Sequence, residues 1–305
     1  MTPKIRAWLL ILLMLALCGG ALWGVIWYRS RFLSPAAMLK RLPTDDAVVL
    51  YIDFRRLRDG GILELLDGSK VGKDPEYQSF VRQTDFDYRH DLDAAMVAFA
   101  PKGKYMLLRG RFDWKSLKRY VQDNDGKCHN SFCNLAGSSP EKRISFFPMQ
   151  PNLMAMAVSD DDVAALRMNT VDARGDAEIP NAPIWISIPP SVVKSGQILP
   201  PGTQMFARSL ERAQAVTLAI VQEGDHFAAK LNVRCASDAD ASALAADLNN
   251  TTGLLRDMIE REHQKANPAD LSGFLTSGAF RSEGARVSGY WRIMRALIEN
   301  LLGGS

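Results

Sequence analysis

The sequence lacks the short motifs that mark several large enzyme classes. It contains no G-x-S-x-G nucleophile turn, no H-E-x-x-H metal motif, no G-x-x-x-x-G-K-S/T phosphate loop and no G-x-G-x-x-G that opens a helix. These absences count against the enzymes that such motifs define. They also give no reason to expect a cofactor, and we expect none.

Acidic residues are missing from the first 41 positions, which carry six basic residues. Residues 42–305 hold 31 basic and 34 acidic residues, so the body is slightly acidic although the whole chain has a net charge of +3. A basic body is the usual footprint of nucleic-acid binding, and we therefore expect no nucleic-acid partner. The hydrophobic fraction of 47% is ordinary for a globular protein, which argues against disorder, collagen or several membrane spans.

Charged residues are also absent from residues 7–28. A helix of that length can cross the roughly 30 Å hydrocarbon layer of a bilayer. Aromatic side chains near both ends, at Trp8, Trp23, Trp27 and Tyr28, are typical of the headgroup level. The apolar run continues past Cys18 and the glycines after it, which disfavours a cleaved signal peptide. We predict a signal anchor in residues 1–29, with residues 7–28 crossing the inner membrane once.

The cysteines bear on which side of the membrane the body occupies. Cys128 and Cys133 enclose four residues, a separation that permits a local disulfide in an oxidising compartment. A zinc site is the alternative, but no second pair of ligands stands at standard spacing. Basic residues flank the apolar run on both sides, so charge alone does not fix its orientation. We predict a periplasmic or otherwise extracytoplasmic body.

The pattern of apolar residues divides the chain into four parts. We expect an anchor (1–29), a juxtamembrane linker (30–41), a first repeat (42–170) and a second repeat (183–303). The predicted fold class is α+β: a single N-terminal transmembrane helix followed by two similar β-α-ββ-α-ββ-α type repeats with mainly antiparallel sheets. The strand order, and whether the repeats share one sheet, stay open.

Two features indicate the duplication. The strand Leu50-Tyr51-Ile52-Asp53-Phe54 aligns with Ile184-Trp185-Ile186-Ser187-Ile188, and each is followed by a hairpin with a glycine in its turn, at Gly103 and Gly224. A helix follows each hairpin, with Asp113 and Ser237 as the expected caps. Chance agreement of two hairpin and helix units is the alternative interpretation.

Two side-chain clusters are candidate sites. Asp85, Asp87, His90 and Asp91 are carboxylates and an imidazole that could hold a divalent ion, although acids before a strand more often cap turns in solvent. Lys115, Lys118 and Arg119 share one face of a predicted helix and could bind a phosphate or an anionic headgroup. The alternative for that basic face is solvation alone.

The run Leu42-Pro43-Thr44-Asp45-Asp46-Ala47 leads into the first strand, and residues 80–93 precede the first hairpin. Together they resemble a family of bacterial membrane-anchored envelope proteins of unknown function, in which an L-P-x-D turn precedes a duplicated α+β body. The resemblance implies a bacterial envelope protein and transfers no catalytic residues.

Three functions are compatible with these features of the sequence. The first is a non-enzymatic binding or assembly module that holds an envelope protein or a ligand in the groove between its halves. The second is a metal-dependent or other hydrolase that acts in the periplasm and uses Asp85, Asp87, His90 and Asp91. The third is a subunit of a membrane complex that meets its neighbours through the span.

Overall fold

The computed structural model describes residues 19–20, 33–65, 74–137, 139, 142–168, 178–195, 210, 213–224, 226–262 and 266–303. The strands are β1 (Val48–Ile52), β2 (Leu92–Ala100), β3 (Gly103–Gly110), β4 (Lys127–His129), β5 (Phe132–Ala136), β6 (Arg143–Gln150), β7 (Leu153–Ser159), β8 (Ile184–Ile188), β9 (Ala215–Glu223), β10 (His226–Arg234), β11 (Ala279–Glu283) and β12 (Arg286–Ile293). The helices are α2 (Pro35–Leu39), α3 (Phe54–Asp59), α4 (Ile62–Leu65), α5 (Pro75–Thr84), α6 (Tyr88–Asp91), α7 (Trp114–Asp123), α8 (Ala164–Arg167), α9 (Pro190–Ser195), α11 (Asp238–Arg261), α12 (Leu271–Thr276) and α13 (Arg295–Gly303).

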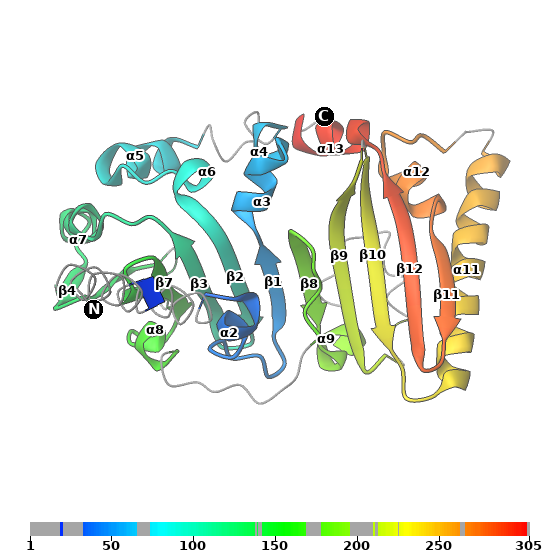
Figure 1. The fold of residues 1–305 in the computed structure, drawn as a ribbon, viewed down its shortest axis with the longest axis horizontal. Coiled ribbons are helices and arrows are strands. Elements are labelled where there is room, and N and C mark those ends of the chain that lie inside the picture. Colours follow the sequence, from blue (N-terminus) through cyan, green and yellow to red (C-terminus); the bar gives the residue numbers. More distant parts are fainter. Residues whose placement is uncertain are drawn as a thin grey trace, which may run out of the picture.

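All the described strands belong to one sheet of 12 strands, in the order β11-β12-β10-β9-β8-β1-β2-β3-β7-β6-β5-β4. Every described pairing is antiparallel. Figure 1 shows the sheet running across the molecule, with β4 toward one end and β11 near the other. The expected α+β class with antiparallel pairing is confirmed.

The two halves of the chain meet at the centre of the sheet, where β1 pairs with β8. Moving outward from this junction, the first half places its strands in the order β1-β2-β3-β7-β6, and the second half in the order β8-β9-β10-β12-β11. The first half then continues with β5 and β4. Strands that are adjacent in space are therefore often distant in sequence, since β7 lies beside β3 and β12 beside β10.

Alternation along the strands sends side chains to two faces, and each face has its own core. On the first face, Tyr51 and Trp185 join a core that α2 and α8 cover through Met38 and Ala164. On the second face, α11 closes a core in the second half and α7 closes one in the first half. Within the described residues, no helix covers the first face of the second half, so a groove forms beside α2.

Side-chain caps fix where the helices begin. Asp113 accepts hydrogen bonds from the backbone N–H groups of Lys115 and Ser116 at the start of α7, and Ser237 accepts one from Asp240 at the start of α11. Both caps were predicted from the sequence, since short polar side chains satisfy the free N–H groups of a first turn. Gly224 has φ of 63° in the turn between β9 and β10, a conformation that disfavours other residues.

Several predicted boundaries were wrong. The cysteine loop forms a short hairpin, β4 and β5. The second half has one 24-residue helix, α11, where the sequence predicts a helix over residues 238–248 and a second stretch from Leu254. It also has β11, which we did not predict. Within the predicted linker, residues 35–39 form α2, whose Met38 is fully buried.

The predicted anchor lies outside the described residues, apart from Gly19 and Gly20. Among the residues that the structure does describe, no helix combines the length and apolar character needed to cross a bilayer.

Candidate functional site

The main candidate site is a groove on the first face of the sheet, where the two halves meet. A cavity of about 420 Å³ there is lined by Leu39 of α2, Val49 of β1, Trp185 of β8 and Thr217 of β9. A second cavity of about 480 Å³ extends over β9, β10 and β12. The two cavities share lining residues, including Ile179 and Thr217, so they form one continuous groove.

Trp185 lines this central groove and stacks on Tyr51, which itself lines neither cavity. Tyr51 and Trp185 are cross-strand partners, and their rings stack with centroids 5.5 Å apart. Both side chains are almost fully buried. The indole Nε1 of Trp185 is buried and has no hydrogen-bond partner among the described residues. A buried donor without a partner costs about 1–3 kcal/mol, so this unpaired N–H lowers the stability of the fold.

The hydroxyl group of Tyr51 stays protonated at neutral pH. Burial and the nearby negative charge of Asp53 raise the pKa of Tyr51 to about 12. The hydroxyl donates to the Asp53 carboxylate at 3.3 Å. The Tyr51–Trp185 pair is therefore uncharged at neutral pH.

The rim of the groove carries charges of both signs. Lys40 lines the cavity next to α2, and Arg234 lines the outer cavity. Arg286 pairs with Glu178 at 2.7 Å, and Lys230 pairs with Glu223 at 2.5 Å. The hydrogen bond from Lys230 lowers the pKa of Glu223, which keeps this carboxylate ionised. These paired charges suit binding better than acid–base chemistry, because Glu178, the acidic residue among the described lining residues, is held in an ion pair with Arg286.

Cys128 and Cys133 form a disulfide between β4 and β5. The two residues are directly opposite each other in the hairpin, and Cys133 is completely buried in the core under α7. The bond therefore joins the outermost strand of the sheet to its neighbour, far along the sheet from the central groove.

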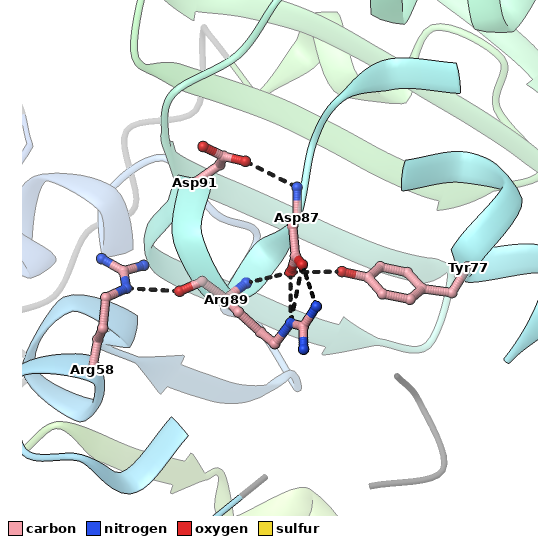
Figure 2. Close-up of polar contacts among 5 residues, drawn as sticks. All are labelled: Arg58, Tyr77, Asp87, Arg89 and Asp91. Carbon is pink, nitrogen blue, oxygen red and sulfur yellow. Dashed lines mark hydrogen bonds and ion pairs between the residues drawn. The ribbon is translucent and has the colours of Figure 1, made fainter. Parts of the chain in front are cut away.

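The acidic cluster does not assemble into a metal site. Asp87 caps α6 and accepts hydrogen bonds from the Tyr77 hydroxyl at 3.0 Å and from the Arg89 guanidinium at 2.5 Å. Asp91 accepts the backbone N–H of Asp87 at 2.9 Å, and Figure 2 shows these contacts converging around Asp87. No group of three or more His, Cys, Asp or Glu among the described residues is placed to hold a metal ion.

The remaining members of that cluster are exposed and serve other roles. Asp85 ends α5 in the left-handed conformation, with φ of 54°. The carbonyl of His90 accepts a hydrogen bond from Arg111. Arg58 ties α3 to the same segment by donating to the Arg89 carbonyl at 2.7 Å. The metal hypothesis is therefore not supported, because the carboxylates accept hydrogen bonds from nearby backbone N–H groups and arginine side chains instead.

The protonation of this network is fixed at neutral pH. Burial acts to raise the pKa of Asp87, but hydrogen bonds from Arg89 and Tyr77 outweigh it and bring that pKa down to about 2. Burial and the hydrogen bond to Asp87 raise the pKa of Tyr77. Neither group changes charge near neutral pH, as a general acid or base would need to.

The basic residues Lys115, Lys118 and Arg119 lie on α7, as predicted, with Lys115 and Arg119 exposed. The helix lies on the opposite face of the sheet from the central groove. These bases therefore do not contribute to the groove, and an anionic-ligand role for them stays a prediction.

The sequence did not identify the groove residues as a site. In the sequence, Trp185 is distinguished only as the counterpart of Tyr51 in the internal alignment. Lys40 is distinguished only as a basic residue near the predicted span. The alignment of Tyr51 with Trp185 was the available signal. It could not be used without the strand order that brings these residues together.

No family model matches the chain, and no curated protein matches it. The chain is similar to solved structures of TP0453. In crystal form III the identity is 10% and the TM-score 0.49, with 85% of this chain and 94% of that chain covered. In crystal form I the values are 13% and 0.45, with 84% and 94% covered. Similarity at this level carries no argument about function.

Proposed function

We propose that this protein is a membrane-anchored, extracytoplasmic binding or assembly module, and that it holds an envelope partner in the central groove. The observation that carries the proposal is a continuous groove lined by both halves of the chain at the β1–β8 junction. Binding sites in proteins commonly lie where two structural units meet.

The geometry of the groove favours binding over catalysis. Its described lining combines apolar side chains such as Leu39 and Trp185 with hydroxyl, amide and paired charged groups such as Thr217, Gln214 and Arg286. An apolar centre with a polar rim is typical of protein-binding surfaces. The two adjoining cavities, which share Ile179 as a lining residue, suit an extended segment that crosses the sheet.

We further propose that the two halves arose by duplication. The matching outward strand order supports this, as does the register in which Tyr51 faces its aligned counterpart Trp185. A duplicated body places equivalent surfaces on both sides of its centre. The groove between the two halves is then a surface that neither repeat forms by itself.

The membrane location is part of the proposal and rests on the sequence. The uncharged run at residues 7–28 supports a span that contacts the lipid bilayer. The Cys128–Cys133 disulfide supports an oxidising compartment for the body. The resemblance of residues 42–53 to bacterial membrane-anchored envelope proteins supports the same assignment.

The test is site-specific photocrosslinking of the full-length protein in its own membrane. A benzophenone amino acid at Thr217 lies in the groove, and one at Arg119 on α7 is the matched control. We expect a stoichiometric partner to crosslink at Thr217 and not at Arg119, and its crosslinked peptide to identify the bound segment by mass spectrometry. Equal crosslinking at both positions would contradict the groove.

A groove-filling variant gives an independent measurement. Ala215→Trp places a large side chain in the groove, whereas Leu254→Trp changes an exposed residue of α11. We expect co-purification of the partner to fall only in Ala215→Trp. Deletion of residues 1–29 separates the third hypothesis, because loss of the partner in that variant alone means that the span, not the groove, makes the contact.

A further inference from the structure

A separate cavity of about 350 Å³ lies on the second face of the sheet in the first half, under α5 and α7. Its walls are the aromatic rings of Phe80, Phe86, Phe112, Tyr120 and Phe146, a leucine and a valine of α7, and leucine, isoleucine and methionine side chains from the strands beneath. The cavity lies on the opposite face from the central groove, so it belongs to a different site.

The aromatic rings form a connected frame around this apolar cavity. Phe80 contacts Phe86 and Tyr120 edge to face, with centroids 6.2 and 5.1 Å apart. Phe86 stacks on Phe112 at 5.4 Å, and Phe112 contacts Trp114 at 5.2 Å. Side chains in a protein core normally pack closely, whereas Phe80, Phe86 and Phe112 stay only half-buried around a cavity that opens to solvent. These rings therefore leave uncovered some apolar surface that a close-packed core would bury.

Water is a poor occupant of the apolar cavity. Of the described residues that line it, Tyr120 alone carries a side-chain hydroxyl, amide or charge. A water molecule in a buried site needs about two to four polar partners, and apolar cavities without them stay dry and bind apolar molecules. The volume is also within the roughly 300–1,000 Å³ of small-molecule pockets. Among the described residues, no charged side chain lines the cavity and could pair with an ionised group.

We propose that the apolar cavity binds an uncharged hydrocarbon group of a small ligand. The group is either a free apolar molecule or the tail of an amphiphile whose polar end stays in solvent. Contact with the ring faces and with the methionine and leucine side chains supplies the affinity, because burial of apolar surface contributes about 25 cal/mol per Å².

The test uses full-length protein in its membrane and an uncharged aryl diazirine as the probe. After irradiation, mass spectrometry of peptides measures labelling of the cavity walls against labelling elsewhere on the same chain. We expect saturable labelling of the peptides from α5, α7 and β6. Ile144→Trp fills the cavity and is expected to reduce that labelling roughly tenfold, whereas Leu254→Trp is expected to leave it unchanged.

Two further arms make the result decisive. Leu135→Phe is a milder filling variant to use if Ile144→Trp does not fold, as judged by circular dichroism. Competition by dodecane alone assigns a free hydrocarbon, and competition by dodecanoate as well assigns the tail of an amphiphile. Labelling that neither competitor reduces, or that stays equal in the filled variants, overturns the proposal. Because no groove residue is changed, this result is independent of partner binding in the central groove.

Discussion

Tyr51 and Trp185 lie directly opposite each other across the junction of the two halves, with their ring planes inclined by 24°. The same two residues align when the halves are compared in sequence. If the halves are repeats, a pair of equivalent residues facing each other lies on the axis that relates them. The aromatic pair then marks the junction of the two halves, and its Trp185 also lines the groove.

Replacement of Trp185 should separate stability from binding. Trp185→Ala is expected to lower the free energy of unfolding by about 3–5 kcal/mol, because it removes a buried ring and leaves a cavity. Trp185→Phe should cost less, since the indole N–H has no partner to lose. Urea denaturation of the full-length protein in mild detergent measures both values.

Trp291 is the matched control for that experiment. Its indole nitrogen is also buried without a partner among the described residues, but it packs in the core under α11, away from the groove. Trp291→Phe and Trp185→Phe should therefore have similar effects on stability, and only Trp185→Phe should weaken partner co-purification. Equal loss of the partner in both would mean that general destabilisation explains the result.

Reduction of the Cys128–Cys133 disulfide is expected to destabilise the protein by about 2 kcal/mol, because the loop that it closes is short. A fall in Tm of several degrees on adding reductant would show this. The double variant Cys128→Ser/Cys133→Ser should start at the lower Tm and show no further response.

The same disulfide reports the side of the membrane. With the body outside the cytoplasm, Cys128 and Cys133 should resist maleimide in intact cells until reductant is added. Cys235 provides an internal comparison, since it is buried and burial raises the pKa of its thiol, which slows its reaction. Labelling of Cys128 and Cys133 without reductant would contradict an oxidising compartment.

Asp87 should make stability depend on pH in acid. Its pKa in the folded protein is about 2, below its usual 3.8. Its ionised form therefore stabilises the fold above the unfolded-state pKa, and this contribution disappears as the pH falls toward the folded-state value. We expect Asp87→Asn to cost about 1 kcal/mol at neutral pH, given the partial exposure of the network.

The comparison with wild type gives the sign of this effect. The difference in unfolding free energy between wild type and Asp87→Asn should shrink as the pH is lowered from about 4 to about 2. Asp85→Asn is the control, because Asp85 is exposed at the left-handed end of α5, a conformation that asparagine also tolerates. A constant difference over this range would rule out ionisation of Asp87 as the cause.

Divalent ions should not stabilise the acidic segment. Metal analysis of the full-length protein is expected to find no stoichiometric ion that depends on His90, and Zn²⁺ or Mg²⁺ should leave Tm unchanged in both wild type and His90→Ala. A ligand that binds only the folded state raises Tm, so an increase that His90→Ala abolishes would restore the metal hypothesis.

Local elements were readable from the sequence, whereas their assembly was not. Alternating apolar residues predicted the hairpins of β2 with β3 and of β9 with β10, and short polar residues predicted the caps of α7 and α11. The sequence indicated a helix over residues 238–248 and a second helical stretch from Leu254, but α11 continues through Gly253, where an added Cβ would meet nothing within 4 Å. Pairing of β1 with β8 depends on contacts between residues far apart in the chain. The groove exists only after that pairing, which is why its residues could not be found.

The burial of Met38 limits how far the body can stand from the bilayer. Helix α2 is fixed to the sheet through this residue and also forms one wall of the groove. If residues 7–28 cross the membrane, only residues 29–34 separate the span from α2, and even fully extended they reach about 20 Å. In the proposed membrane topology, the α2 wall of the groove would therefore lie within about 20 Å of the lipid surface, and a partner would be bound there.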